Sequence, residues 1–408
     1  MLIYIIYKLA TTNGSIPECK CYKCLASDHH TCLWYTMRII NNSIFLTTEI
    51  FDILSQFGGN SKESYCVLDI ETTGLSASIS SLYMVGILWY NLAGDKTVST
   101  RQWFADDYES EKDILLSVAT FLGRFNTVVT YNGDTFDIPY LQKKYKTHKL
   151  ASPFDDLKTI DVYGKIRHLK NIIKSKNLKL ATVEKLVGFR RQHELSGREC
   201  IGLYTEYMQA KILNVPKSND LRDQLLFHNM EDIIGTYQSA LFLSYLIMPE
   251  TERVRFSTNH INVKFSNKFI YPQNDSFETN GYTLTFSNNT LYLRTRIKKG
   301  VLYHFFEDYK HYFYLPAEDI AIHKSVAQYM DPHLRQQAKA SNCYNKYSGT
   351  FIRIPQNFKP SIKQLIFTPE YKSKDLYLPL QEFESETTLP PEIVKTLNEL
   401  ALFLITTI

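Results

Sequence analysis

Two carboxylates occupy the end of a predicted strand in the segment VLDIETTGL, residues 67–75. The segment begins with apolar residues typical of a strand, contains Asp69 and Glu71, and reaches a turn at Gly74. Side chains alternate between the two faces of a strand, so Asp69 and Glu71 are expected to project to the same side. Such a pair can hold a hard divalent cation through its oxygen atoms, although a helix cap or a surface acid pair would give the same pattern.

A third carboxylate, Asp137, follows another predicted strand. The apolar run at 127–131 leads into YNGDTFDIPYL at 131–141, where a turn is expected at Asn132. Apolar residues on either side of Asp137 would anchor this segment in the core, and that anchoring would fix the direction of the carboxylate.

A histidine and a fourth carboxylate lie on a predicted helix, LLFHNMEDIIGTY at 225–237. His228 and Asp232 are four residues apart, so they share one face of this helix, whereas Glu231 points elsewhere. Considered alone, His228 would more often be a buried core histidine than a site residue.

The elements around these residues follow a mixed order of strands and helices. Apolar runs and helical periodicity predict strands at 65–71, 82–90, 97–104, 127–131 and 160–162, a helix over 110–125, and a mainly helical stretch from 163 to 247. Three strands followed by alternating helices and strands predict an α/β domain with a mixed β-sheet flanked by helices.

The pattern changes after Pro249 to alternating apolar and polar residues, which predicts a smaller β-rich (α+β) region over 250–408. We expect a helical piece around 318–340 and an amphipathic helix at the end of the chain. Basic residues cluster in this region and could extend a nucleic-acid groove or belong to a packing or partner domain. They are Arg294, Arg296, Lys298 and Lys299.

Together, the motifs Asp69-Ile-Glu71, Asn132-x3-Phe136-Asp137 and His228-x3-Asp232 resemble the three exonuclease motifs of the DEDD superfamily. The closer resemblance is to its YprB-like, ribonuclease H-like branch. It includes the segments LYMVGILWY, QWF, TIDVY and VEKLVGFRR and covers about residues 65–247. The resemblance implies a ribonuclease H-like exonuclease domain over 65–247, followed by an extension of the kind that some bacterial members carry.

The resemblance also implies that Asp69, Glu71, Asp137 and Asp232 bind two divalent ions, either Mg²⁺ or Mn²⁺. Carboxylate oxygens suit these hard cations, and two ions can stabilise the attacking and leaving oxygens of a phosphodiester displacement. Four clustered carboxylates without metal would repel one another. The implied function is 3′–5′ exonuclease action on DNA or RNA, with single-stranded ends as the expected substrate.

By the same resemblance, His228 would orient or deprotonate the attacking water, and its unperturbed pKa of ~6.5 suits that role. The chain departs here from the family pattern, which has Tyr-x3-Asp or His-x4-Asp, so His228 takes the position of the tyrosine. A nucleic-acid-binding protein of the same fold with weak or no activity therefore stays open as an alternative. An endonuclease of the same fold stays open as well.

Substrate contacts are expected near the motifs and in the basic segment 165–191, which carries nine Lys or Arg residues and a single acid. Phosphate contacts give affinity without sequence preference, and a solvated basic helix face is the alternative. Asp161 would either support the metal ligands or serve the fold. The expected substrate-binding residues are Thr72, Leu75, Asn132, Phe136, Lys165, Arg167, Arg190 and Arg191.

The composition is that of an ordinary globular protein, at 44% hydrophobic and 22% charged residues, and 408 residues favour two domains. No run of 18 apolar residues occurs, and the first residues lack a basic leader. We therefore expect a cytoplasmic protein with nucleic acid as its partner and no membrane association. The oligomeric state cannot be derived from the sequence.

The first 36 residues contain a pattern C-x2-C-x4-H-x2-C, formed by Cys21, Cys24, His29 and Cys32. These residue types and this tight spacing could form a zinc site. The segment 1–36 could instead be a disordered or spurious upstream extension of the reading frame. Residues 37–64 would then be a lead-in segment to the exonuclease domain.

Overall fold

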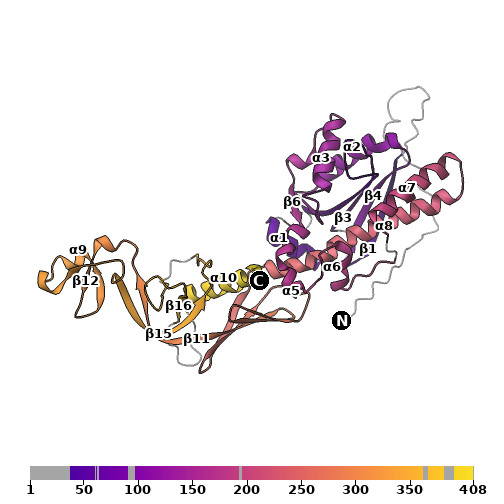
Figure 1. Cartoon of the computed structure of the whole chain (residues 1–408). Helices are drawn as coiled ribbons and strands as arrows, with labels where there is room; N and C mark the ends of the chain where they lie inside the picture. Colours follow the sequence, from indigo (N-terminus) through magenta and orange to yellow (C-terminus); the bar gives the residue numbers. More distant parts are fainter. Residues whose placement is uncertain are drawn as a thin grey trace. The chain divides into compact units, whose positions relative to one another are not determined.

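The computed structural model describes residues 37–59, 61, 64–90, 97–192, 195–361, 366–380 and 390–407 (Figure 1). These residues form two compact units. The first contains the residues up to Arg167 together with Ser175–Leu243, and the second contains His168–Lys174 and the residues from Ser244 onward. The possible zinc ligands, between positions 21 and 32, lie outside the described residues.

A six-stranded mixed sheet forms the centre of the first unit, in the order β1-β4-β3-β2-β5-β6. β2 pairs antiparallel with β3 and parallel with β5, β4 is antiparallel to both β3 and β1, and β6 is parallel to β5. The predicted mixed sheet is therefore confirmed. The strands are β1 (Met37–Phe45), β2 (Tyr65–Thr72), β3 (Leu82–Tyr90), β4 (Thr97–Ala105), β5 (Thr127–Thr130) and β6 (Lys158–Asp161).

Helices cover both faces of this sheet, which explains why β2 and β3 are apolar almost throughout. Trp103 of β4 packs edge-on against Phe121 of α2 (Glu111–Leu122), with 5.2 Å between ring centroids. The next residue, Phe104, faces the other way and packs against Tyr207 of α7 (Gly197–Ile212), also at 5.2 Å. The alternation along β4 thus places α2 on one face of the sheet and α7 on the other.

The stretch predicted to be mainly helical contains a series of short helices followed by two long ones, as expected. In the part of the chain that the structure describes, no helix is long and apolar enough to cross a lipid bilayer. The helices from β5 onward are α3 (Asp137–Thr147), α4 (Val162–Ile166), α5 (Lys170–Ile173), α6 (Leu180–Leu186), α7 and α8 (Lys217–Ser239).

The predicted lead-in segment, residues 37–64, contributes a strand and a helix to the first unit. β1 pairs with β4 from Met37 opposite Ala105 to Phe45 opposite Thr97. Helix α1 (Glu49–Gly58) follows and ends at Gly59, whose φ of 71° suits glycine. β1 is an edge strand that exposes much of its surface. Its central residues are therefore polar, and the alternation of apolar and polar residues that identifies a strand is not visible in its sequence.

The second unit is β-rich, as predicted. Its main sheet has the order β16-β15-β11-β10-β9, and β8 adds to β11 and in turn pairs with β7. The expected terminal helix is α10 (Pro391–Thr407), and it begins at a proline, a residue that suits the first turn of a helix. The strands are β7 (Glu250–Phe256), β8 (His260–Ser266), β9 (Ser276–Thr279), β10 (Tyr282–Ser287), β11 (Thr290–Phe305), β15 (Tyr344–Ile354) and β16 (Leu376–Leu380).

The helical piece expected around 318–340 is wrong for most of its length. A small three-stranded sheet takes its place, formed by β12 (Tyr312–Leu315), β13 (Ile320–His323) and β14 (Gln336–Gln337). Only α9 (Lys324–Ala327) is helical between them, apart from a 3₁₀ turn. Asp319, at a φ of 57°, makes the turn between β12 and β13, and this hairpin prevents a continuous helix.

Candidate active site

β2 brings Asp69 and Glu71 to the face of the sheet that α8 covers. Glu71 meets His228 of α8, and Asp69 accepts a hydrogen bond of 2.9 Å from the side chain of Asn229 on the same helix. The local reason is the strand itself, since its two-residue period points both carboxylates the same way. Glu71 is buried and also accepts a hydrogen bond of 3.3 Å from the Tyr83 hydroxyl.

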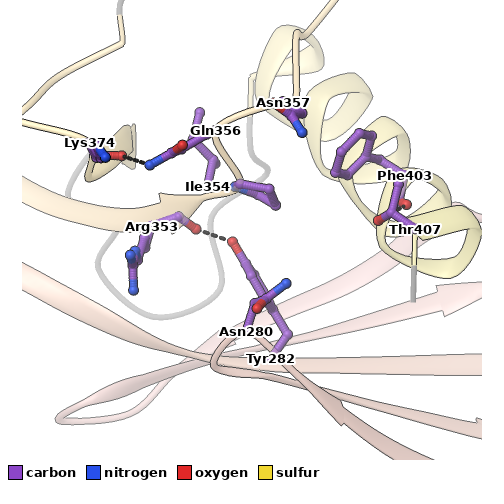
Figure 2. Close-up of a pocket in the computed structure, with 10 residues that line it drawn as sticks. Asn280, Tyr282, Arg353, Ile354, Gln356, Asn357, Lys374, Phe403 and Thr407 are labelled. Carbon is purple, nitrogen blue, oxygen red and sulfur yellow. Dashed lines mark hydrogen bonds between the residues drawn. The ribbon is translucent and has the colours of Figure 1, made fainter.

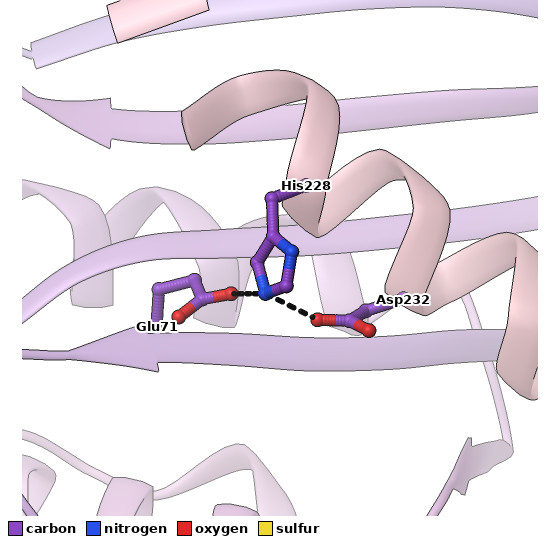
Figure 3. A group of neighbouring side chains, drawn as sticks. All are labelled: Glu71, His228 and Asp232. Carbon is purple, nitrogen blue, oxygen red and sulfur yellow. Dashed lines mark ion pairs between the residues drawn. The ribbon is translucent and has the colours of Figure 1, made fainter. Parts of the chain in front are cut away.

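The side chain of His228 lies between two carboxylates, as Figure 3 shows. Its Nε2 is 3.1 Å from Asp232 Oδ2 and 3.6 Å from Glu71 Oε1. Among the described residues, Glu71, His228 and Asp232 are the one group of such side chains whose ligand atoms all lie within 4.8 Å of one another. The expected metal ligands Asp69 and Asp137 lie outside this closest group.

Asp137 is the first residue of α3 and follows a turn that other groups hold in place. Asn132 has a φ of 63° in this turn, a conformation that asparagine tolerates better than most residues. Its backbone N–H donates to Asp161 Oδ1 at 2.7 Å, and the N–H of Gly164 donates to the same oxygen at 3.1 Å. Asp161 therefore supports the turn before Asp137 and caps α4.

Burial raises the pKa of three of the carboxyl groups well above their ordinary values. The pKa of Glu71 rises to about 7 and that of Asp137 to about 7. At Asp69, the charges of Asp232, Asp137 and Glu71 add to the effect of burial. Although Asp69 and Asp137 lie outside the closest group, their charges therefore belong to the same electrostatic site.

Asp232 and His228 differ from these three carboxyl groups because each favours the charged form of the other. Burial alone would raise the pKa of Asp232, but the hydrogen bond and charge of His228, together with Arg191, lower it. Burial alone would lower the pKa of His228, but Asp232, Cys200 and Glu71 raise it to about 11. The site therefore places the His228 imidazolium between the ionised carboxylate of Asp232 and the carboxyl group of Glu71.

A buried amide relay fixes the carboxylate of Asp69, and the sequence analysis missed it. The Gln102 side chain donates to Asn229 Oδ1 at 2.9 Å, and Asn229 donates to Asp69 Oδ2 at 2.9 Å. The Asn229 side chain packs directly against Gly86 of β3, and a Cβ atom at that glycine would lie 2.1 Å from Asn229 Oδ1. The one available hint was the position of Asn229 directly after His228.

Arg191, expected to bind phosphate, is instead part of the interior of the site. Its side chain is 6% exposed, and Nη2 lies 2.5 Å from Asp232 Oδ1. Nε and Nη2 also form two hydrogen bonds with Glu184, at 2.6 and 3.0 Å. Glu184 in turn fills the space beside Gly235 of α8, where a Cβ atom would lie 2.3 Å from its Oε2. Because both acids already occupy its guanidinium, Arg191 cannot also serve as a surface phosphate contact in this conformation.

The other expected substrate-binding residues differ in their exposure and in the contacts that they already make. Thr72 uses its hydroxyl for the Gly74 carbonyl, at 2.8 Å, and Leu75 is 86% exposed in the loop that follows. Phe136 packs against Tyr140, with 5.6 Å between ring centroids. In the basic segment, the Lys165 ammonium lies 5.3 Å from the centre of the Phe57 ring, while Arg167 and Arg190 are exposed.

A pocket of about 470 Å³ lies in the second unit, between β15, the turn before β10 and the end of α10 (Figure 2). One of its two basic residues, Arg353, is paired with Asp375 at 2.5 Å, and Gln356 donates to the backbone carbonyl of the other, Lys374, at 3.0 Å. None of the predicted site residues lines this pocket, so the candidate active site is the acidic cluster of the first unit.

Residues 66–238 match the family model described as RNase_H superfamily. The first unit has a ribonuclease H-like fold. The fold prediction is thereby confirmed, including the smaller β-rich region that follows the ribonuclease H-like domain. The assignment to the DEDD superfamily and its YprB-like branch stays a prediction.

Two DNA polymerases are similar to parts of this chain. The chain is 25% identical over 145 residues to DNA polymerase 1 of Aeropyrum pernix, which is 34% of this chain and 14% of the polymerase. Among solved structures, the family B DNA polymerase from the hyperthermophilic archaeon Pyrobaculum calidifontis matches with a TM-score of 0.31 and 13% identity. That match covers 59% of this chain and 33% of the polymerase. The chain therefore spans a minor part of the length of both polymerases.

Proposed function

We propose that the ribonuclease H-like domain is a metal-dependent 3′–5′ exonuclease that acts on single-stranded ends of DNA or RNA. The observation that carries the proposal is the convergence of Asp69, Glu71, Asp137 and Asp232 in one electrostatic site. Three separate elements supply these carboxylates, namely the interior strand β2 and the helices α3 and α8. The sequence similarity to DNA polymerase 1 of Aeropyrum pernix supports nucleic acid as the substrate.

The donor set fits divalent ions such as Mg²⁺ or Mn²⁺. Carboxylate oxygens are the ligands that these hard cations prefer, and burial, which disfavours the charged form, raises the pKa of Glu71 and of Asp137 to about 7. The four carboxylates would hold the ions. When bound, two ions supply a nucleophilic hydroxide and stabilise the charge on the leaving oxygen.

The residues of the chain itself then have two tasks. The carboxylates orient the attacking water, whose oxygen forms a bond to phosphorus while the bond to the 3′ oxygen breaks. The products are a nucleoside 5′-monophosphate and a strand with a new 3′ hydroxyl. His228 can accept the proton of the water only if the charges of Asp232 and Glu71 are compensated, since these two carboxylates, together with Cys200, raise its pKa to about 11.

A nucleic-acid-binding protein without turnover is the second candidate. It is favoured by the two cationic groups on Asp232, because Arg191 contacts Oδ1 and His228 contacts Oδ2. If both contacts persist in the presence of Mg²⁺, the carboxylate would have no free oxygen for an ion, and the domain would bind nucleic acid without cleaving it.

The test is a cleavage assay with linear strands labelled at the 3′ or the 5′ end and with a circular single strand of the same sequence. We expect immediate release of labelled mononucleotide from the 3′ label, a ladder from the 5′ label, and an intact circle. The reaction should need Mg²⁺ or Mn²⁺ and stop with EDTA. Degradation of the circle would instead identify an endonuclease.

The matched control is a double variant, Asp69→Ala with Glu71→Ala, purified in the same way. It should lose cleavage and keep its fold, as judged by circular dichroism, which would exclude a contaminating nuclease. Cleavage by this variant, or binding without cleavage by the wild-type protein, would overturn the exonuclease proposal.

A further inference from the structure

One face of the sheet in the second unit gathers arginines from two strands. Side chains alternate along β11, so Arg294 and Arg296 share a face, while Leu293 and Thr295 point to the other face and are buried. Arg253 and Arg255 take the equivalent positions on β7. All four arginines are exposed, and we call them the arginine face.

The strand register sets the spacing of these arginines. Arg255 of β7 lies opposite Asn262 of β8, and Asn262 lies opposite Arg294 of β11. The two arginines are therefore two strands apart, or about 10 Å, whereas neighbouring arginines on one strand are about 7 Å apart. The result is an array of four guanidinium groups on an exposed, pleated surface.

Little on this surface neutralises the array. None of the four arginines forms an ion pair with any residue that the structure describes. The nearby Glu252 is paired with Lys264 at 2.7 Å. Glu278 lies on β9, two strands from Arg294, with Thr283 between them. Glu250 also lies on this face of β7, opposite Ser266 of β8. An array of four arginines without ion pairs is typical of a surface that contacts a polyanion.

The buried side of the same strands already supplies the core of this unit. Ile261, Val263, Leu291 and Leu293 are at most 1% exposed. The arginines are therefore not needed to cover apolar surface. An aromatic ring accompanies them instead, since Tyr292 follows the same face of β11 and is 45% exposed.

We propose that the arginine face binds the backbone of a single-stranded nucleic acid, with Tyr292 as a platform for a base. The proposal rests on the proposed function, because it adds a second contact surface for the same class of substrate. Guanidinium groups bind phosphates through paired hydrogen bonds. A positive surface with an exposed ring is the combination that holds single strands without sequence preference.

The test measures binding of a labelled single strand of about twenty nucleotides to the full-length protein by fluorescence anisotropy. EDTA is present, so that no cleavage occurs. Four arginine-to-glutamine changes, at Arg253, Arg255, Arg294 and Arg296, should weaken binding roughly tenfold or more at moderate salt. The slope of log affinity against log salt should become shallower by up to about 3, at ~0.7 for each phosphate contact on a single strand.

The matched control removes four positive charges from other exposed positions of the same unit, as the combined Lys→Gln variant of Lys310, Lys339, Lys359 and Lys372. This variant should bind like the wild-type protein. Equal loss in both variants would overturn the proposal, because net charge alone would then explain the binding. Displacement of the strand by polyglutamate at equal charge concentration would overturn it as well.

Tyr292→Leu separates stacking from charge. It should weaken binding roughly fivefold or more and leave the salt slope unchanged, since stacking on a ring involves no counterion release. An unchanged affinity would remove Tyr292 from the site. These binding measurements contain no metal and do not depend on cleavage. A failure of the exonuclease proposal would therefore not affect them, and a failure to bind at the arginine face would not affect the cleavage assay.

Discussion

At the scale of single residues, the candidate site depends on side chains that hold the carboxylates as much as on the carboxylates themselves. The clearest example is Asn229, which is fully buried, receives a hydrogen bond from Gln102 and passes one on to Asp69. Gly86 leaves room for this amide. Groups that orient metal ligands in this way commonly contribute 10- to 100-fold to metal affinity or activity.

Replacing Asn229 by leucine should therefore lower kcat for strand cleavage about 10- to 100-fold and weaken Mn²⁺ binding, with KM for the strand little changed. The steady-state constants and a Mn²⁺ titration check this. Asn219→Leu is the control, because Asn219 is exposed on the same helix, where it accepts only from Arg222. Similar losses in both variants would refute a positioning role for Asn229.

The ion pairs of Arg191 should contribute strongly to stability, because Arg191 and Glu184 are almost fully buried. Arg191→Met would leave the charge of Glu184 uncompensated, so the free energy of unfolding should fall by about 3 kcal/mol or more. Urea denaturation measures this. Lys217→Met breaks the exposed pair with Glu206 and should cost no more than about 1 kcal/mol. Equal costs would contradict the structural role of Arg191.

At the scale of elements, α8 provides three residues of the site, and its close packing explains a glycine near its end. Gly235 lies where the buried carboxylate of Glu184 needs space, and a Cβ atom there would be 2.3 Å from Glu184 Oε2. In α7, by contrast, a Cβ atom on the exposed Gly202 would meet nothing within 4 Å. A larger residue therefore has no space at Gly235, whereas it has space at Gly202.

The same substitution should consequently have opposite signs at the two positions. Gly235→Ala should destabilise the protein by about 1–3 kcal/mol, because the added methyl group displaces the Glu184–Arg191 pair. Gly202→Ala should stabilise it by about 0.5–1 kcal/mol, through helix propensity alone. Thermal unfolding of both variants tests this. A stabilising Gly235→Ala would mean that Glu184 does not occupy that space.

Much at the element scale could be predicted from the sequence, and the exceptions share a cause. Strand alternation was enough to direct Asp69 and Glu71 to one face, and helical spacing was enough to pair His228 with Asp232. The bond between Gln102 and Asn229 joins positions 127 residues apart, which no local pattern reveals. Arg191 was expected at the surface because a run of charge does not show which member has buried partners.

At the scale of the whole molecule, metal binding, the protonation of the site and the stability of the fold should depend on one another. In the metal-free protein, the pKa values of Glu71 and Asp137 are raised to about 7, above the ordinary carboxyl range. Groups with a raised pKa in the folded state contribute stability below their unfolded pKa, and this contribution is lost as the pH rises through the folded value. The pKa of His228 is also raised in the folded state, so its contribution to stability likewise falls as the pH rises above its unfolded pKa of ~6.5.

Divalent metal should therefore stabilise the protein more at about pH 8 than at about pH 6, because ions compete with protons for these carboxylates. The measurement is the melting temperature with and without Mn²⁺ at both values. The double variant Asp69→Ala with Glu71→Ala should show little change at either. A larger Mn²⁺ effect at the lower pH would contradict the assigned site.

The central claim is that the four carboxylates of the ribonuclease H-like domain form a divalent-metal site despite the cations now on Asp232. Calorimetric titration of Mn²⁺ into the full-length protein near neutral pH tests it most directly. We expect saturable binding with release of protons, lost when Asp69 and Glu71 are replaced by alanine. Absence of binding would show that Arg191 and His228 permanently occupy Asp232, and would leave a nucleic-acid-binding protein without a hydrolytic centre.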